Sequence, residues 1–155
     1  MKMVQKNFKK AFTLVELLVV IGILAILTAV VLVAVNPARQ LMQARNTERS
    51  AEVNSILSAI TAYIADPINN GAVPASGGTI VSCSTSGTVW SNIGTSTAAG
   101  FVNLKTDLAP TYIADMPMDP SGTEGDTGYD VCQSTANRIT VSAPSAEGAT
   151  IEVTR

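Results

Sequence analysis

The apolar residues of the chain follow two different patterns. Residues 17–35 form an uninterrupted apolar run of nineteen residues without a charged side chain. As an α-helix this run would be about 28 Å long, close to the roughly 30 Å hydrocarbon core of a bilayer. The pattern predicts one membrane-spanning helix.

A second helical pattern follows Pro37. Proline lacks an amide hydrogen and crowds the preceding turn, so we expect a kink at Pro37 within a helix that continues beyond it. Over residues 38–66, apolar side chains recur at the i, i+3, i+4 and i+7 spacing of one buried helix face. This face consists of Val53, Ile56, Leu57, Ile60 and Ile64.

Residues 43–52 of this helix are polar on all sides. Arg45 and Glu48, like Arg49 and Glu52, stand three positions apart, a spacing that favours weak ion pairs on a solvated helix. The sequence therefore predicts surface pairs, with alignment of neighbouring copies of the chain as the alternative role.

The rest of the chain contains short strand-like runs. Asp66-Pro67 should end the helix, because the residue before a proline is pushed out of the helical region. Residues 71–100, rich in Ser, Thr, Gly and Ala, predict an irregular connection with one hairpin from residues 79–83 and 88–90. The β-branched runs 129–132, 138–142 and 150–153 predict a three-stranded antiparallel sheet. Its apolar face should cover the helix face, which gives an α+β fold.

Charge is divided unevenly along the chain. Residues 1–11 carry four lysines and no acidic residue, which is typical of a cytoplasmic N-terminal segment. Three arginines soon follow the apolar run, so the predicted orientation rests on the basic leader. Without the leader, six basic residues stand against twelve acidic ones, a net charge of −6. Because this acidic remainder has no basic stripe, we expect no direct binding to nucleic acid.

The residue types argue against most enzyme classes. The chain has no histidine, which excludes histidine-dependent triads and histidine-ligated metals. It has no phosphate-binding glycine loop of known spacing, and no carboxylate pair stands out for acid–base chemistry. We therefore expect neither enzyme activity nor a cofactor.

Two cysteines, Cys83 and Cys132, fall in the part of the chain expected outside the membrane. An oxidising environment would permit a disulfide between them, and the alternative is two separate small apolar side chains. Their spacing matches no zinc site.

The stretch KKAFTLVELLVVIGILAIL, residues 9–27, resembles the processing and assembly motif of type IV pilins and type II secretion pseudopilins. The resemblance implies cleavage by a prepilin peptidase between Ala11 and Phe12, and N-methylation of Phe12. Ala11 stands where the family usually has glycine, which bears on the efficiency of cleavage. Further implied partners are other copies of the chain, an inner-membrane assembly platform and a cytoplasmic ATPase.

Glu16 stands at the edge of the apolar run, where an ionised carboxylate is costly and should have a partner. In a filament of this family, that partner would be the new ammonium of Phe12 on a neighbouring subunit, so that two buried charges neutralise each other. Glu16 would then set the register of the subunits, while the apolar helices supply the association. The alternative is a Glu16 that only sits among lipid headgroups.

Residues 112–131 loosely resemble a loop that binds calcium in some pseudopilins. Asp119, Glu124, Asp126 and Asp130 could supply oxygen ligands. Their spacing matches no calcium motif, however, so the sequence favours solvated acidic turns and no metal site.

The expected organisation has four parts: a cleaved leader at residues 1–11, a transmembrane and filament-core helix at 12–36, its amphipathic continuation at 37–66, and an extracellular loop-and-sheet region at 67–155. Before assembly the chain would be a single-pass membrane protein in contact with lipid; afterwards it would be part of a surface filament. The expected function is that of a structural subunit of a type IV pilus-like filament. The alternatives are a secretion pseudopilin and a monomeric, membrane-anchored binding or adhesion module.

Overall fold

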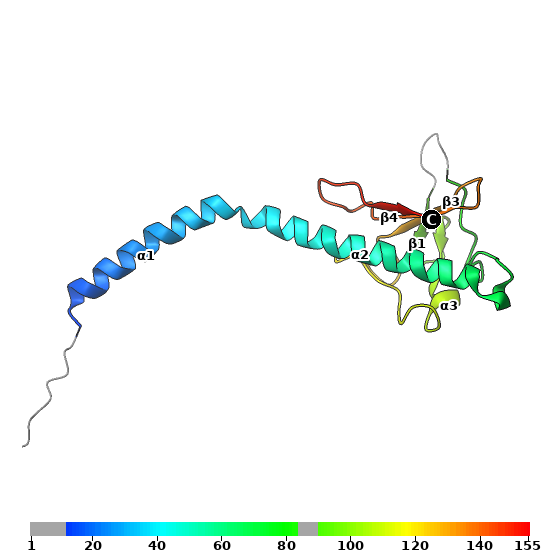
Figure 1. Cartoon of the computed structure of the whole chain (residues 1–155), viewed down its shortest axis with the longest axis horizontal. Coiled ribbons are helices and arrows are strands. Elements are labelled where there is room, and N and C mark those ends of the chain that lie inside the picture. Colours follow the sequence, from blue (N-terminus) through cyan, green and yellow to red (C-terminus); the bar gives the residue numbers. More distant parts are fainter. Residues whose placement is uncertain (1–11, 84–89) are drawn as a thin grey trace, which may run out of the picture. The chain divides into compact units, whose positions relative to one another are not determined.

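The computed structural model describes residues 12–83 and 90–155, which belong to two compact units divided after Gln40. Figure 1 shows the elements in chain order. They are α1 (Leu14–Val35), α2 (Pro37–Ala65), a 3-10 turn (Pro67–Asn69), β1 (Ser91–Ile93), β2 (Phe101–Val102), α3 (Lys105–Leu108), β3 (Asp130–Gln133), β4 (Ile139–Ser142) and β5 (Glu152–Thr154).

The first unit is dominated by α1, a helix of 22 residues without a single buried side chain. Its length of about 33 Å and its mean hydropathy of 3.2 are those of a helix able to cross a membrane. The apolar run therefore forms the predicted helix, and none of its side chains is buried in a single copy.

Helical hydrogen bonding is interrupted just before Pro37. Asn36 adopts a left-handed conformation with φ of 42° and caps the end of α1. Its side-chain oxygen accepts a hydrogen bond from the amide of Arg39 at 3.3 Å, and Pro37 is the first residue of α2. We expected one helix that continues through Pro37, whereas the structure has two. Asparagine tolerates the left-handed conformation and serves as a helix N-cap, and proline suits the first helical position, so Asn36-Pro37 both ends and starts a helix.

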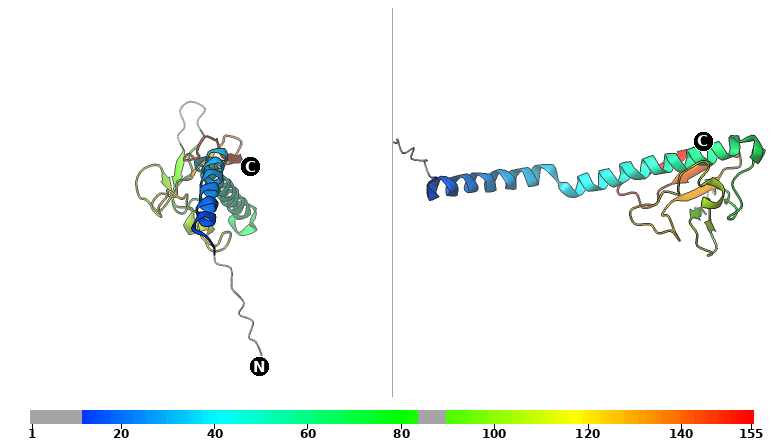
Figure 2. Two further views of the ribbon diagram at one scale, coloured as in Figure 1. Left: turned by 90° about the vertical axis from the view of Figure 1, so that its left-hand side faces the viewer. Right: turned by 90° about the horizontal axis from the view of Figure 1, so that it is seen from below.

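The second unit is built around the amphipathic face of α2, as predicted. Val53, Ile56, Leu57 and Ile60 are buried, and Ile64 packs against the same cluster. The cluster continues into the sheet through Val131, Ile139 and Val141 and also contains the fully buried Tyr129. Figure 2 shows the sheet lying along one side of this helix.

The sheet has five strands in the order β2-β1-β3-β4-β5, and it is mixed. Strands β3, β4 and β5 pair antiparallel and correspond to the three predicted runs. The three predicted antiparallel strands are therefore confirmed, but the sheet is larger and mixed, because β1 adds antiparallel to β3 and β2 adds parallel to β1. These two strands have only three and two residues, too few to form a recognisable alternating pattern.

Part of the region expected to be irregular also lies against the sheet. Ser82 forms an isolated parallel bridge with Gln133, next to hydrogen bonds that join Val81 and Cys83 to the same residue. The predicted hairpin needs Thr88 and Val89 as its second arm, and both lie outside the described residues. In the described part, residues 81–83 therefore pair with β3.

Candidate assembly site

Thr13 and Glu16 together form a capping box at the start of α1. The Thr13 hydroxyl accepts a hydrogen bond from the Glu16 amide at 3.2 Å. In return, the Glu16 carboxylate accepts bonds from the Thr13 amide at 2.8 Å and from its hydroxyl at 2.9 Å. An N-terminal cap satisfies amides that have no partner in the helix and contributes about 1 kcal/mol. Glu16 thus has a local role in the single chain that we did not anticipate, although Thr-x-x-Glu is a recognisable sequence signal for it.

Only one oxygen of the Glu16 carboxylate accepts hydrogen bonds from the described residues. Both Thr13 bonds reach Oε2, and no hydrogen bond or ion pair of the described residues involves Oε1. The carboxylate can therefore accept one more donor, such as an ammonium group, without breaking the capping box.

Phe12 directly precedes the capping box and is 88 % exposed. The large apolar residues that follow along α1 are also exposed, so Phe12 continues an apolar surface that surrounds the helix. Ala11, on the other side of the expected cleavage point, lies outside the described residues together with the leader lysines.

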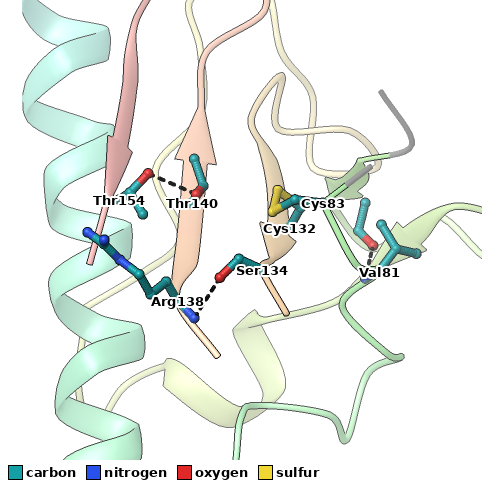
Figure 3. The surroundings of a disulfide bond; sticks show 8 residues. Val81, Cys83, Cys132, Ser134, Arg138, Thr140 and Thr154 are labelled. Atoms are coloured by element: carbon teal, nitrogen blue, oxygen red, sulfur yellow. Dashed lines mark hydrogen bonds between the residues drawn. A yellow bond between two sulfur atoms is a disulfide. The ribbon is translucent and has the colours of Figure 1, made fainter. Parts of the chain in front are cut away.

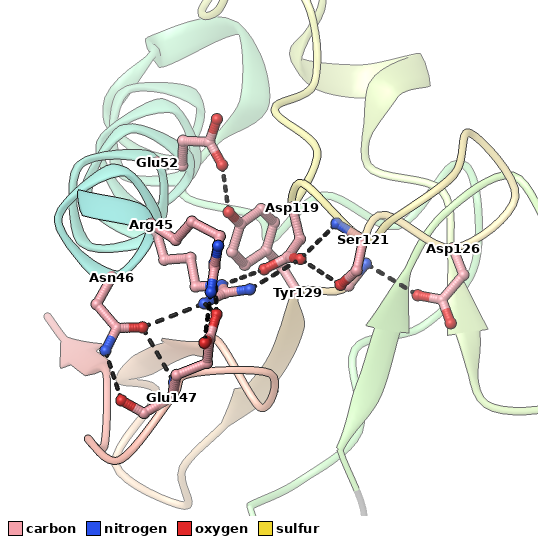
Figure 4. Close-up of polar contacts among 10 residues, drawn as sticks. Arg45, Asn46, Glu52, Asp119, Ser121, Asp126, Tyr129 and Glu147 are labelled. Carbon is pink, nitrogen blue, oxygen red and sulfur yellow. Dashed lines mark hydrogen bonds and ion pairs between the residues drawn. The ribbon is translucent and has the colours of Figure 1, made fainter. Parts of the chain in front are cut away.

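A buried ion pair lies in the second unit, between α2 and the loop before β3 (Figure 4). The guanidinium of Arg49 contacts the carboxylate of Asp119 through Nε and Nη2, and the two residues are 3 % and 2 % exposed. Ser121 donates to the same carboxylate through its amide at 2.8 Å and its hydroxyl at 2.5 Å. Burial alone would raise the pKa of Asp119, but the bonds from Arg49 and Ser121 outweigh it and hold the pKa at about 2.

The loop between β4 and β5 is attached to α2 beside this pair. The guanidinium of Arg45 makes two hydrogen bonds of 2.6 Å to the Glu147 carboxylate, and Arg49 reaches it at 3.3 Å. The Asn46 side chain donates to the Glu147 carbonyl at 2.8 Å and accepts from the Glu147 amide at 3.0 Å. The bonds from Arg45 and Arg49 lower the pKa of Glu147 to about 2.

A third contact completes this side of α2. The hydroxyl of Tyr129 donates to the carboxylate of Glu52, and burial together with this bond raises the pKa of the tyrosine. Burial also raises the pKa of Glu52.

The predicted pairs along the polar part of α2 were therefore wrong. Arg45, Arg49 and Glu52 bind residues about 70 to 102 positions away, and no bond within the described chain joins either predicted pair. No signal in residues 43–52 alone reveals this, because their partners are brought together only by the fold.

One comparison with known proteins gives a match. A family model described as the prokaryotic N-terminal methylation motif matches residues 6–32. The chain carries the N-terminal methylation motif of prepilin-like proteins. This motif is the signature of type IV pilin-like and pseudopilin-type proteins, and with the apolar α1 it fits a membrane-anchored precursor and a structural role. No curated protein and no solved structure matches the chain.

The matched range includes Phe12, the capping box and most of α1. It ends before α2, so the ion pairs and the sheet are known from the structure alone. Together, the motif and the structure give an α+β pilin-like arrangement: a long apolar helix, a second helix and a small mixed sheet.

The four acidic residues considered as calcium ligands do not form one site. Asp119 is engaged by Arg49, and Glu124 lies 3.8 Å from the ammonium of Lys105. Asp126 accepts a bond from the Gly128 amide, while burial and the nearby Asp126 raise the pKa of Asp130 to about 6. Within residues 12–83 and 90–155, no three acidic or cysteine side chains converge as metal ligands. The guanidinium of Arg49 supplies the cation for Asp119.

Cys83 and Cys132 are joined by a disulfide with an S–S distance of 2.08 Å (Figure 3). The bond links residues 81–83 to β3 and spans 49 positions of sequence. Cys132 is 1 % exposed.

Proposed function

We propose that this protein is a structural subunit of a type IV pilus-like extracellular filament. A prepilin peptidase cuts the precursor between Ala11 and Phe12 and methylates the new amine of Phe12. The processed chain then polymerises through α1, and Glu16 sets the register between subunits. The N-terminal methylation motif at residues 6–32 supports this reading.

The exposed apolar surface of α1 is the observation that carries the proposal. None of the 22 residues of this helix is buried within the described chain. Such a surface is stable in lipid or against other apolar helices, but unfavourable in water. A subunit that leaves the bilayer therefore needs further copies of α1 around its own.

The free oxygen of Glu16 suggests how register is set. A neighbouring Phe12 ammonium can bind Oε1 while Oε2 keeps both bonds from Thr13. An apolar environment penalises an uncompensated charge strongly, so a subunit docked at a wrong axial offset leaves two charges without partners. The capping box also reduces the entropic cost of forming this ion pair, because the Glu16 side chain is already held in position before the partner arrives.

This function implies a topology and a set of partners. The basic leader stays in the cytoplasm and residues 41–155 lie outside, where oxidising conditions maintain the disulfide between Cys83 and Cys132. An inner-membrane platform and a cytoplasmic ATPase drive extraction from the lipid. The motif is shared with pseudopilins, so a secretion pseudopilin is the second candidate. The loop at residues 112–131 does not favour that candidate, because the buried carboxylate of Asp119 is bound by Arg49 and not free for calcium.

Two variants separate the charge of Glu16 from its role as a cap. Glu16→Gln keeps an oxygen that can accept the Thr13 bonds but removes the charge, whereas Thr13→Val removes the hydroxyl and keeps the charge. We expect Glu16→Gln to reduce the yield of sheared surface filaments at least tenfold, and Thr13→Val to leave most of it. Membrane insertion should be equal in both. Normal filament yield from Glu16→Gln would refute the register mechanism.

A further inference from the structure

The outer face of the sheet carries a polar row at one end. The register aligns Asn92, Asp130, Ser142 and Glu152 across β1, β3, β4 and β5. Paired residues share a face and successive residues alternate, so this row lies opposite the buried row that contains Val131 and Val141. These four residues therefore face away from α2.

A hollow of about 430 Å³ lies over this row. Trp90 contributes to its wall, and its two charged groups are the carboxylates of Asp130 and Glu152. Neither carboxylate forms an ion pair with any described residue, and no lysine or arginine lines the hollow. Two carboxylates beside an indole ring attract a cation that also has a flat, weakly hydrated face, which is the chemistry of a guanidinium group.

The same strands carry positive charge at their other end. Arg138 precedes β4 and Arg155 follows β5, and reciprocal backbone bonds of 3.0 Å join Ile139 to Arg155. Both arginines are exposed, and neither forms an ion pair within the described ranges. Ser142 lies four residue steps after Arg138 along the strand, a distance of about 13 Å. One end of the β4–β5 ladder is thus cationic and the other anionic.

We propose that Arg138 of one copy enters the hollow of a second copy and binds between Asp130 and Glu152, against Trp90. The contact joins two different surfaces, so each copy offers both halves and the association continues without closing on itself. A contact of this kind suits a filament and would act outside the α1 core. It also lowers the repulsion expected between chains that each carry a net charge of −6 without the leader.

This inference rests on the proposed filament, and residue-specific cross-linking in filaments tests it. Thr150 borders the hollow and Ala136 lies two positions before Arg138; both are exposed. In sheared filaments of the full chain carrying Thr150→Cys and Ala136→Cys together, a short bismaleimide should produce a ladder of multimers. Either cysteine alone should give no ladder.

Charge swaps then identify the pair. Arg138→Glu or Glu152→Arg alone should weaken the ladder about tenfold, roughly 1.4 kcal/mol of contact energy. The double swap should restore part of it, because the pair between positions 138 and 152 is then reversed while Asp130 is unchanged. Glu48→Arg is the control: it makes the same charge change as Glu152→Arg, but at an exposed position of α2, and should leave the ladder unchanged. Filaments that show no ladder, or a ladder indifferent to the swaps, would overturn this contact alone; absence of filaments from the parent chain would contradict the proposed function as well.

Discussion

Removal of the Arg49 side-chain charge gives the sharpest test of the ion pair in the second unit. Arg49→Met keeps much of the apolar stem but leaves the buried Asp119 carboxylate without its cation. Breaking a buried pair by removing one partner costs about 3 to 5 kcal/mol. The pKa of Asp119, held at about 2 against an ordinary value of 3.8 by Arg49 and Ser121 together, corresponds to roughly 2 kcal/mol. We therefore expect a loss of about 3 kcal/mol in the free energy of unfolding.

Arg45→Met is the matched control. Arg45 also pairs with a carboxylate, but its side chain is 38 % exposed and that of Glu147 is 30 % exposed. Solvent-exposed pairs contribute less than about 1 kcal/mol, so this variant should unfold close to the parent. Urea unfolding of the full chain in detergent, followed by the fluorescence of the single tryptophan, measures both. Equal losses in the two variants would refute the argument from burial.

The same pair predicts a pH dependence. A carboxyl group whose pKa is lower in the folded chain stabilises the fold above its unfolded pKa and loses that contribution as the pH falls. For Asp119 this loss runs from about pH 4 to pH 2. The parent should lose stability in this range more steeply than Arg49→Met, and parallel curves would contradict the assignment of the low pKa to Arg49.

Three further predictions concern the second unit. Reduction of the disulfide between Cys83 and Cys132 should lower the free energy of unfolding by about 4 kcal/mol, since the bond spans 49 positions; an unchanged urea midpoint after reduction would contradict this. Addition of calcium or EDTA should leave the thermal midpoint unchanged, because Arg49 holds Asp119, and a calcium-dependent rise would show a metal site. Tyr129→Phe should cost about 1 kcal/mol through the lost bond to Glu52, and equal stability would show that this bond contributes nothing.

Regular periodicity made the helical structure of α1 and α2 and three strands predictable, whereas the four-residue α3 was not predicted. The apolar run and the i, i+3, i+4 face of α2 each extend over several turns, so the pattern identifies them without knowledge of the fold. The β-branched runs at β3, β4 and β5 are likewise local signals. Strands β1 and β2 were missed because their pairing depends on neighbours far along the chain, and not on their own two or three residues.

The polar contacts also differ in whether the sequence could predict them: contacts between near neighbours in the chain could be predicted, and long-range contacts could not. Thr13 and Glu16 are three residues apart, so their capping box was open to prediction from the sequence. Arg49 and Asp119 are 70 residues apart, and the arginine also had a plausible partner at Glu52 on its own helix. Arg49 binds the buried carboxylate of Asp119 and not that of Glu52, and only the fold brings Arg49 and Asp119 together.

The central claim is that α1 leaves the bilayer to pack among its own copies. The most direct measurement combines imaging of sheared surface material with mass spectrometry of its N-terminus. We expect thin filaments built from this chain, beginning at an N-methylated Phe12. A protein found only as membrane-bound monomers, with the lysines of residues 1–11 still attached, would contradict the account.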